Sequence, residues 1–184
     1  MLQWFRRRAE ADRRAGELYG SVVTAARQPA FYADMGVPDT PEGRFELIAL
    51  HLFLALEGAK ERDTADTALS QRTIEAFVTD MDDCMREMGV GDMAVGKRVK
   101  RAAAAFYERA NAYRRSLAAA ETEDLEASLE GYVFAGDPTS RAGAVSLAGY
   151  VRGAAAALSA QPFETLSADG ALGRLLENSR IEVS

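Results

Sequence analysis

Hydrophobic residues recur at spacings of three and four along most of the chain, the pattern of amphipathic α-helices that each bury one face. Between residues 66 and 88, for example, Ile74, Phe77 and Met81 fall on a single stripe. The pattern predicts about six main helices, at residues 12–28, 41–56, 66–88, 92–117, 122–134 and 141–160, followed by short helical turns at 163–167 and 170–177. Because these segments are too short for a coiled coil, the predicted fold class is all-α, a compact multi-helix bundle.

The segment 41–56 differs from the others because it is apolar on nearly every side after Glu46. A helix without a polar face is surrounded by other elements, so we expect this one at the centre of the bundle. Thr40 is expected to cap its N-terminus, with Pro41 in the first helical position. A strand is the other interpretation of so apolar a run, but its length and its leucine and alanine content oppose that. His51 lies midway along the segment, and we expect it to be buried and hydrogen-bonded to a neighbouring helix.

Length and composition are those of a single helical domain spanning residues 1–184, with a loose tail at about 178–184. The one cysteine, Cys84, falls on a core-facing helical position, excludes an internal disulfide and fits a reducing compartment. No apolar run approaches the ~18 residues that a membrane span needs. Residues 1–8 lack the long apolar stretch of a secretion signal. We expect a cytoplasmic protein and leave open a peripheral place at the inner face of the cytoplasmic membrane.

Motifs of enzymes are missing from the sequence. It contains no nucleophile elbow, Walker loop, zinc-protease helix motif or EF-hand loop. One histidine and one cysteine cannot form the usual His/Cys metal cluster, and Asp82 and Asp83 diverge because they are adjacent on a helix. A general base at His51 needs a nucleophile or a substrate cleft beside it, and no pattern indicates either. We therefore expect no enzymatic activity, no cofactor and no metal.

Charge is distributed unevenly along the chain. The formal net charge of −6 argues against a general nucleic-acid binder, and no DNA partner is expected. Residues 96–115 nevertheless carry seven lysines and arginines against one acid, whereas residues 121–137 carry six acids and no base. The most distinctive stretch, residues 89–101, combines three glycines, one acid and four cations between two predicted helices. A glycine-rich turn that leads into a basic helix is suited to an acidic or anionic partner.

The four cations of this stretch are Lys97, Arg98, Lys100 and Arg101. Like charges three or four residues apart destabilise an isolated helix by roughly 0.2–0.5 kcal/mol per pair. The cations also lie at the N-terminal end of their helix, where the helix dipole disfavours positive charge. Either the acids at 121–130 compensate them within the fold, or they face an anionic partner. RNA on ribosomes and anionic lipid both satisfy the electrostatics.

Two further groups of residues are candidates for binding. Phe31 and Tyr32 lie between the first two predicted helices, where they either plug the end of the bundle or stay partly exposed for a partner. Four methionines, Met81, Met85, Met88 and Met93, either fill the core or line a groove, since methionine repacks around varied partners.

Several blocks of the sequence occur together in a known order. They are Gln28-Pro-Ala-Phe-Tyr-Ala-Asp-Met-Gly-Val-Pro-Asp-Thr, Gly43-Arg-Phe-Glu, His51-Leu-Phe-Leu, Ala76-Phe-Val-Thr-Asp-Met-Asp, Met85-Arg-Glu-Met-Gly-Val-Gly-Asp-Met-Ala-Val-Gly-Lys-Arg-Val-Lys-Arg and Ala105-Phe-Tyr-Glu-Arg. With them the chain resembles the ubiquinol–cytochrome c chaperone family, whose members assist assembly of the respiratory cytochrome bc1 complex. The resemblance covers roughly residues 17–135. Because this sequence has no targeting extension, it looks like a bacterial member.

The resemblance implies an all-α assembly factor without enzymatic activity. Mitochondrial members of the family engage newly made cytochrome b, work with a small partner protein and sit near the ribosomal exit. The function expected here is therefore an assembly chaperone that binds newly made cytochrome b, with a ribosome, an anionic membrane surface and a small partner protein as further partners. The residues expected to face a partner are Phe31, Tyr32, Met88, Asp92, Met93, Lys97, Arg98, Lys100 and Arg101. The alternative is a small-molecule or lipid-binding helical module with a cavity beside His51.

Overall fold

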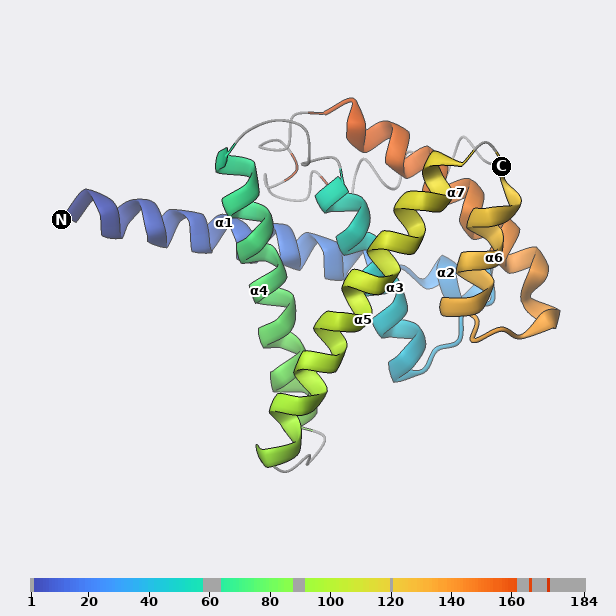
Figure 1. Cartoon of the computed structure of the whole chain (residues 1–184), viewed down its shortest axis with the longest axis horizontal. Helices are drawn as coiled ribbons and strands as arrows, with labels where there is room; N and C mark the ends of the chain where they lie inside the picture. The colour runs from blue at the N-terminus through green and yellow to red at the C-terminus, as the bar shows by residue number, and fades with distance from the viewer. Residues whose placement is uncertain are drawn as a thin grey trace.

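The structure is a computed structural model that describes residues 2–57, 64–87, 92–119 and 121–161, with the single positions Leu166 and Leu172. Its helices are α1 (Leu2–Ala26), α2 (Pro29–Ala33), α3 (Pro41–Glu57), α4 (Thr64–Glu87), α5 (Asp92–Ala118), α6 (Glu123–Tyr132) and α7 (Arg141–Ser159), with a 3-10 turn at Pro138–Ser140 (Figure 1). The predicted all-α fold is confirmed for these residues. Leu166 and Leu172 are helical and buried, but the rest of the predicted C-terminal turns and the tail lie outside the described residues.

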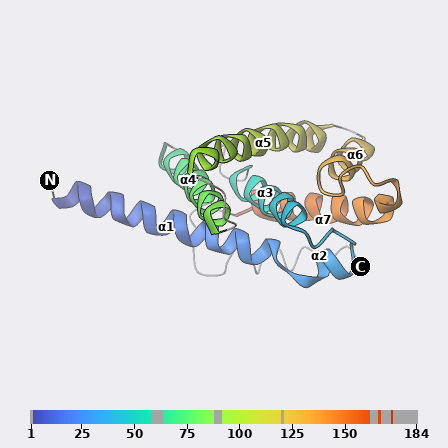
Figure 2. The ribbon, with the colours of Figure 1, turned by 90° about the horizontal axis from the view of Figure 1, so that it is seen from below.

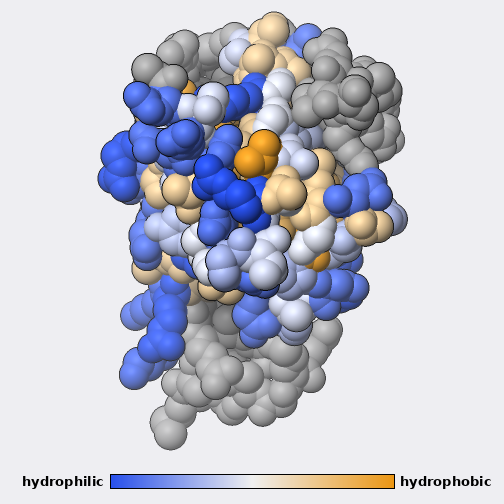
Figure 3. Space-filling view, turned by 90° about the vertical axis from the view of Figure 1, so that its right-hand side faces the viewer, coloured by the Kyte–Doolittle hydropathy of each residue, from blue (hydrophilic) through white to orange (hydrophobic). Residues whose placement is uncertain are grey.

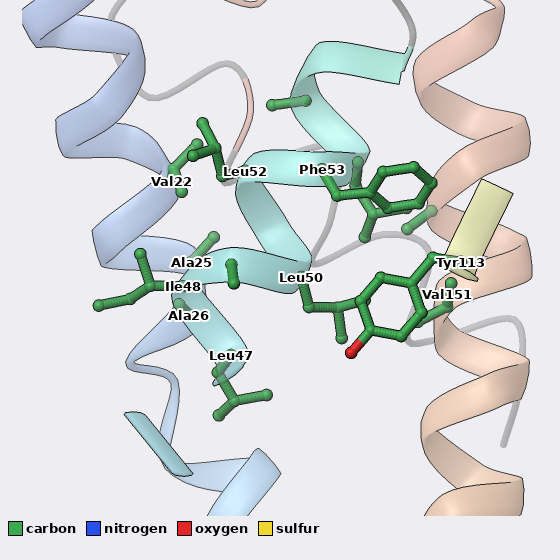
Figure 4. Packing of buried hydrophobic residues seen from close by; sticks show 14 of the residues in the cluster. Val22, Ala25, Ala26, Leu47, Ile48, Leu50, Leu52, Phe53, Tyr113 and Val151 are labelled. Atoms are coloured by element: carbon green, nitrogen blue, oxygen red, sulfur yellow. The ribbon is translucent and has the colours of Figure 1, made fainter. Parts of the chain in front are cut away.

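The central position predicted for residues 41–56 is confirmed. Helix α3 contacts α1, α5 and α7, and Figure 2 shows α1 and α5 on opposite sides of it. Every side chain from Glu46 to Ala55 is buried, and those of α3 pack against Val22 of α1, Tyr113 of α5 and Val151 of α7 in the cluster of Figure 4. Burial on all sides is what a helix without a polar face requires.

The start of α3 is fixed by the predicted cap. The backbone N–H of Gly43 donates to Oγ1 of Thr40 over 3.1 Å, and Pro41 is the first residue of the helix. Gly43 is buried because the Pro38 carbonyl oxygen lies against it, 2.0 Å from where a Cβ would stand. A side chain at position 43 would therefore displace the segment that leads from α2 into α3.

The same connecting segment is held from its other side by α7. The carbonyl oxygen of Met35 lies 2.1 Å from the position that a Cβ of Gly143 would take. Gly36, which follows, has φ +70°, a conformation that only glycine adopts without strain. Two glycines on two helices therefore let the backbone at residues 35–38 pack closely between α3 and α7.

Two local expectations were wrong. Helix α1 begins at Leu2 instead of about residue 12, and ion pairs of Arg13 with Glu10 and Glu17 run along its exposed side. The short helix α2, with Pro29 at its first position, was not expected. No helix in the described part of the chain is long and apolar enough to cross a bilayer.

Candidate partner-binding surface

Three of the predicted cations lie in the open on the N-terminal half of α5. This half is the free end of the α4–α5 hairpin, at the bottom of Figure 1 and away from α6 and α7. The side chains of Lys97, Lys100 and Arg101 are all exposed. Among the described residues, no carboxylate forms an ion pair with any of them. The electrostatic cost of placing them there is not offset by a described carboxylate.

The C-terminal half of α5 is different because its arginines hold the fold together. Nε and Nη2 of Arg109 donate to the two carboxylate oxygens of Glu46 on α3, over 2.5 and 2.6 Å. Nε of Arg114 donates to Glu57 at the end of α3, over 2.9 Å. These bidentate pairs lie where α5 crosses the centre of the bundle, so the two halves of one basic helix have separate roles.

Aromatic rings complete the surroundings of Arg109. Its guanidinium carbon lies 4.7 Å from the ring centre of Tyr132 on α6 and 5.7 Å from that of Phe45 on α3. Burial raises the pKa of the Glu46 carboxyl, and the Arg109 guanidinium opposes that rise. The pair joins α3 and α5 beneath α6, and each carboxylate oxygen of Glu46 accepts a hydrogen bond from Arg109.

Two of the acids that the sequence offered as internal partners of the α5 cations, Glu126 and Glu130, are engaged elsewhere. Nη2 of Arg141 on α7 lies 2.9 Å from Oε2 of Glu126, and Nη1 lies 3.4 Å from Oε2 of Glu130. Both acids are on α6, which packs against the other end of α5 and against α7. Within the described residues, the acids at 121–130 therefore do not compensate the charges of Lys97, Lys100 and Arg101.

Phe31 requires a correction, because it is a core residue. Its ring is 1% exposed and stands edge-on to His51 and Tyr150, with both ring-centre separations at 5.1 Å. Helix α2 folds back on α3 and α7 and thereby seals the end of the bundle with this ring. Tyr32, its neighbour, is half-buried, and its hydroxyl donates to the Ala26 carbonyl over 3.4 Å. Of the predicted aromatic pair, only Tyr32 reaches the surface.

The remaining predicted site residues are described only in part. Met88 lies outside the described residues. Asp92, Met93 and Arg98 belong to the N-terminal half of α5, but their side chains lie outside the description. Their assignment to a partner surface stays a prediction.

One exposed aromatic residue was not among the binding residues predicted from the sequence. Tyr107 on α5 is 52% exposed, more than any other large hydrophobic side chain in the described chain. It falls on the same side of α5 as the free cations, seven residues beyond Lys100. The signal was present in the sequence, because Tyr107 stands outside the apolar stripe formed by Phe106, Ala110 and Tyr113.

The opposite end of the molecule offers little for a hydrophobic partner. Figure 3 shows the side of the molecule on which α6 and α7 lie, where hydrophilic side chains predominate and hydrophobic colour is confined to small separate areas. Scattered hydrophobic side chains on a surface are ordinary and do not mark an interface. This face gives no reason to move the candidate surface away from α5.

The region beside His51 is filled by protein. His51 is fully buried; its Nδ1 donates to the Leu47 carbonyl over 2.7 Å, so Nε2 accepts from the Tyr150 hydroxyl over 2.8 Å. Burial lowers the pKa of His51 to about 4, so the ring is neutral at neutral pH. The rings of Phe31 and Tyr150 occupy the space where a ligand of the alternative small-molecule module was expected. The prediction of a buried histidine bonded to a neighbouring helix is confirmed.

Comparison with known proteins agrees with the fold and the motifs. Residues 33–173 match the family model described as ubiquinol-cytochrome C chaperone. The chain belongs to the ubiquinol–cytochrome c chaperone family. The match starts later than the motif blocks and continues past them, through α6 and α7. No curated protein matches this chaperone.

A solved structure also resembles the chaperone over nearly its whole length. The crystal structure of the Cbp3 homolog from Brucella abortus is similar with a TM-score of 0.77 and 38% sequence identity. The similarity covers 92% of this chain and 93% of the other. The helical fold described above is therefore one that a solved crystal structure shares.

Proposed function

We propose that the protein is a non-enzymatic assembly chaperone that binds newly made cytochrome b and so assists biogenesis of the cytochrome bc1 complex. The observation that carries the proposal is membership of the ubiquinol–cytochrome c chaperone family, over residues 33–173. The proposal places the protein in the cytoplasm, near the inner face of the cytoplasmic membrane where such a client is inserted. A ribosome, an anionic membrane surface and a small partner protein are further candidates for contact in the same process.

The N-terminal half of α5 supports the proposal as the binding surface. Lys97, Lys100 and Arg101 are exposed there without a described carboxylate partner, although each pair of like charges costs helix stability. The fold does not use them in its interior, in contrast to Arg109 and Arg114 of the same helix. Met88, Asp92, Met93 and Arg98 are further proposed members of this surface, whereas Tyr32, on α2, is a separate candidate contact.

The test is recovery of cytochrome b with a tagged copy of the full chain, made in cells that assemble the bc1 complex. We expect cytochrome b to be recovered with the wild-type protein and reduced by about tenfold with the double variant Lys97→Glu/Arg101→Glu, because two attractive charges become repulsive. The matched control is Arg27→Glu/Arg115→Glu, which makes the same change in net charge at exposed positions outside the proposed surface. The control should recover cytochrome b at the wild-type level.

Each variant is also assayed for thermal unfolding, because a loss of binding is informative only if the fold is intact. The melting temperature of the Lys97→Glu/Arg101→Glu protein should be at least that of the control, because acids suit the N-terminal end of α5 and Arg115 lies in its last turn. Failure of the wild-type protein to recover cytochrome b refutes the proposed function. Equal loss of cytochrome b from both double variants refutes the assignment to α5.

A further inference from the structure

A continuous strip of five side chains follows the outer face of α5. Its members, hereafter the α5 strip, are Lys97, Lys100, Arg101, Ala104 and Tyr107, and all five are exposed. Their spacing puts them on one side of the helix, and the rise of an α-helix gives the strip a length of about 15 Å. We infer that the α5 strip binds an acidic peptide segment, and, resting on the proposed function, that the client protein supplies it.

The two ends of the α5 strip have different chemistry. One end carries the three cations, for which no described carboxylate is a partner. The other end carries Tyr107, with half of its side chain in solvent and its ring tilted against the buried ring of Phe106 at 5.5 Å. The Phe106 contact holds the tyrosine in place at the surface. A ligand that matches both ends has carboxylates followed by an apolar side chain.

Ala104 lies between these two ends, and its small side chain leaves space above the middle of the strip. Lys97 and Arg101 stand one turn apart on one side of it, and Tyr107 stands one turn beyond it. A ligand side chain can therefore rest over Ala104 against the Tyr107 ring, while acidic groups one turn away meet the cations. This arrangement fits an amphipathic segment laid along α5.

The charge around the α5 strip favours a short peptide over an extended polyanion. Glu108 is exposed next to Tyr107, and the adjacent helix α4 has exposed Glu75 and Asp83. The whole chain has a formal net charge of −6. RNA or an anionic bilayer reaches beyond the strip and meets these acids within a few screening lengths of about 8 Å. A peptide confined to the strip meets its three cations against one exposed acid, Glu108, which accepts a hydrogen bond from the Tyr132 hydroxyl over 3.2 Å.

The test uses the purified full chain and a designed fluorescent probe, so it does not depend on cytochrome b. The probe is a helical peptide of about 15 residues with glutamates along one side and leucines next to them, and its counterpart has glutamine in place of every glutamate. Fluorescence anisotropy should show binding of the acidic probe, which weakens when NaCl is raised from about 50 to 300 mM. The glutamine counterpart should bind at least about tenfold more weakly.

Variants assign the binding to the α5 strip. Lys97→Glu/Arg101→Glu should weaken binding of the acidic probe by about tenfold or more. Tyr107→Ala should weaken it by about fivefold, since an exposed aromatic contact is lost. Arg27→Glu/Arg115→Glu, with the same change in net charge, should bind the probe like the wild-type protein. Affinity that is unaffected by the strip variants, or affinity lost equally in the control, overturns the inference.

Two competing ligands decide the class of partner. A single-stranded RNA oligonucleotide and vesicles that contain phosphatidylglycerol should each bind more weakly than the acidic probe at the same salt concentration, and tighter binding of either overturns the inference. The outcome is distinct from that of the proposed function. Recovery of cytochrome b that is insensitive to the strip variants leaves the function standing and removes the inference. Probe binding that depends on the strip, without recovery of cytochrome b, supports the inference and refutes the proposed function.

Discussion

Glu46 and Arg109 lie 63 residues apart in the sequence and form a two-pronged ion pair that fastens α5 to α3. Glu46 is 7% exposed, and the Tyr132 ring from α6 covers the guanidinium. Each of them is the last residue of a sequence block that carries the family resemblance, Glu46 of the block 43–46 and Arg109 of the block 105–109. These two blocks are therefore partners in one contact, and this contact sets the position of the helix that presents the α5 strip.

Removing one partner of this ion pair should lower the stability of the protein. Arg109→Met leaves the Glu46 carboxylate buried without its partner, and we expect a loss of about 3–5 kcal/mol in the free energy of unfolding, measured with urea at neutral pH. The double variant Glu46→Gln/Arg109→Met, which removes both charges, should show a clearly smaller loss in the free energy of unfolding. The single-variant penalty should shrink at lower pH, because burial already raises the pKa of Glu46 and protonation removes the unpaired charge.

An exposed ion pair provides the control. Arg44→Met removes the contact between Nε of Arg44 and Oδ1 of Asp39, in which both side chains are more than half exposed, and no measurable loss is expected. Equal losses for Arg109→Met and Arg44→Met would contradict the structural role given to the buried pair.

Acid should destabilise the protein through His51. Its pKa is about 4 in the folded chain against 6.5 in the unfolded one, so the unfolded state binds the proton first as pH falls. The stability from neutral His51 is complete above about pH 6.5 and is lost progressively towards pH 4, with a loss of about 2 kcal/mol between pH 7 and pH 5. The measurement is urea unfolding at both pH values for the wild type and for His51→Gln.

The carboxylates titrate in both proteins, so the difference between them isolates the histidine. His51→Gln should be less stable at pH 7, because the bond to Tyr150 is altered, yet its stability should fall less on acidification. A pH dependence identical to that of the wild type would show that His51 is not the group responsible.

The hydroxyl of Tyr113 should be dispensable for stability. It is fully buried and has no hydrogen-bond partner among the described residues, while the ring packs on Phe53 with a centre separation of 5.6 Å (Figure 4). An unpaired buried hydroxyl costs about 1–3 kcal/mol in desolvation. Tyr113→Phe keeps the ring and should leave the free energy of unfolding unchanged or raise it by about 1 kcal/mol. A clear loss of stability in this variant would indicate a hydrogen bond to an ordered water.

The close packing at Gly143 should not tolerate a methyl group. Gly143→Ala places a Cβ 2.1 Å from the Met35 carbonyl oxygen, so we expect a loss of about 1–3 kcal/mol in the free energy of unfolding. Gly20→Ala is the matched control, because no atom lies within 4 Å of its Cβ position in α1. The control should gain up to about 1 kcal/mol from better helix propensity. A gain in both variants would show that α7 and the residue 35–38 segment separate easily.

Function at the α5 strip should be independent of these structural variants. Tyr113→Phe and Gly20→Ala leave the strip side chains unchanged, so their affinity for the acidic probe should match that of the wild type. Lys97→Glu/Arg101→Glu should have the opposite profile, with a stability at least equal to that of the wild type and weakened binding. Parallel changes of binding and stability across all these variants would contradict the separation of α5 into a structural half and a binding half.

The sequence alone determined the main helices other than the short α2, the central place of α3 and the family. These follow from local patterns: apolar spacing fixes a helix and its buried side, and Thr40 with Pro41 marks where α3 begins. Exposed cations on the N-terminal half of α5 were also readable, because Lys97, Lys100 and Arg101 stand outside the apolar stripe of their helix. The early start of α1 was missed because its first turns are rich in charge.

Only the tertiary structure decided which charges pair and which aromatic residues are free. Phe31 and Tyr32 are neighbours that the sequence does not distinguish, yet the chain reversal at α2 buries the first and half-buries the second. Arg109 and Lys97 occupy one basic helix, but among the described residues Arg109 meets a carboxylate and Lys97 does not, since α3 crosses α5 at Glu46. Pairings between residues tens of positions apart depend on how helices cross, and no local pattern contains that geometry.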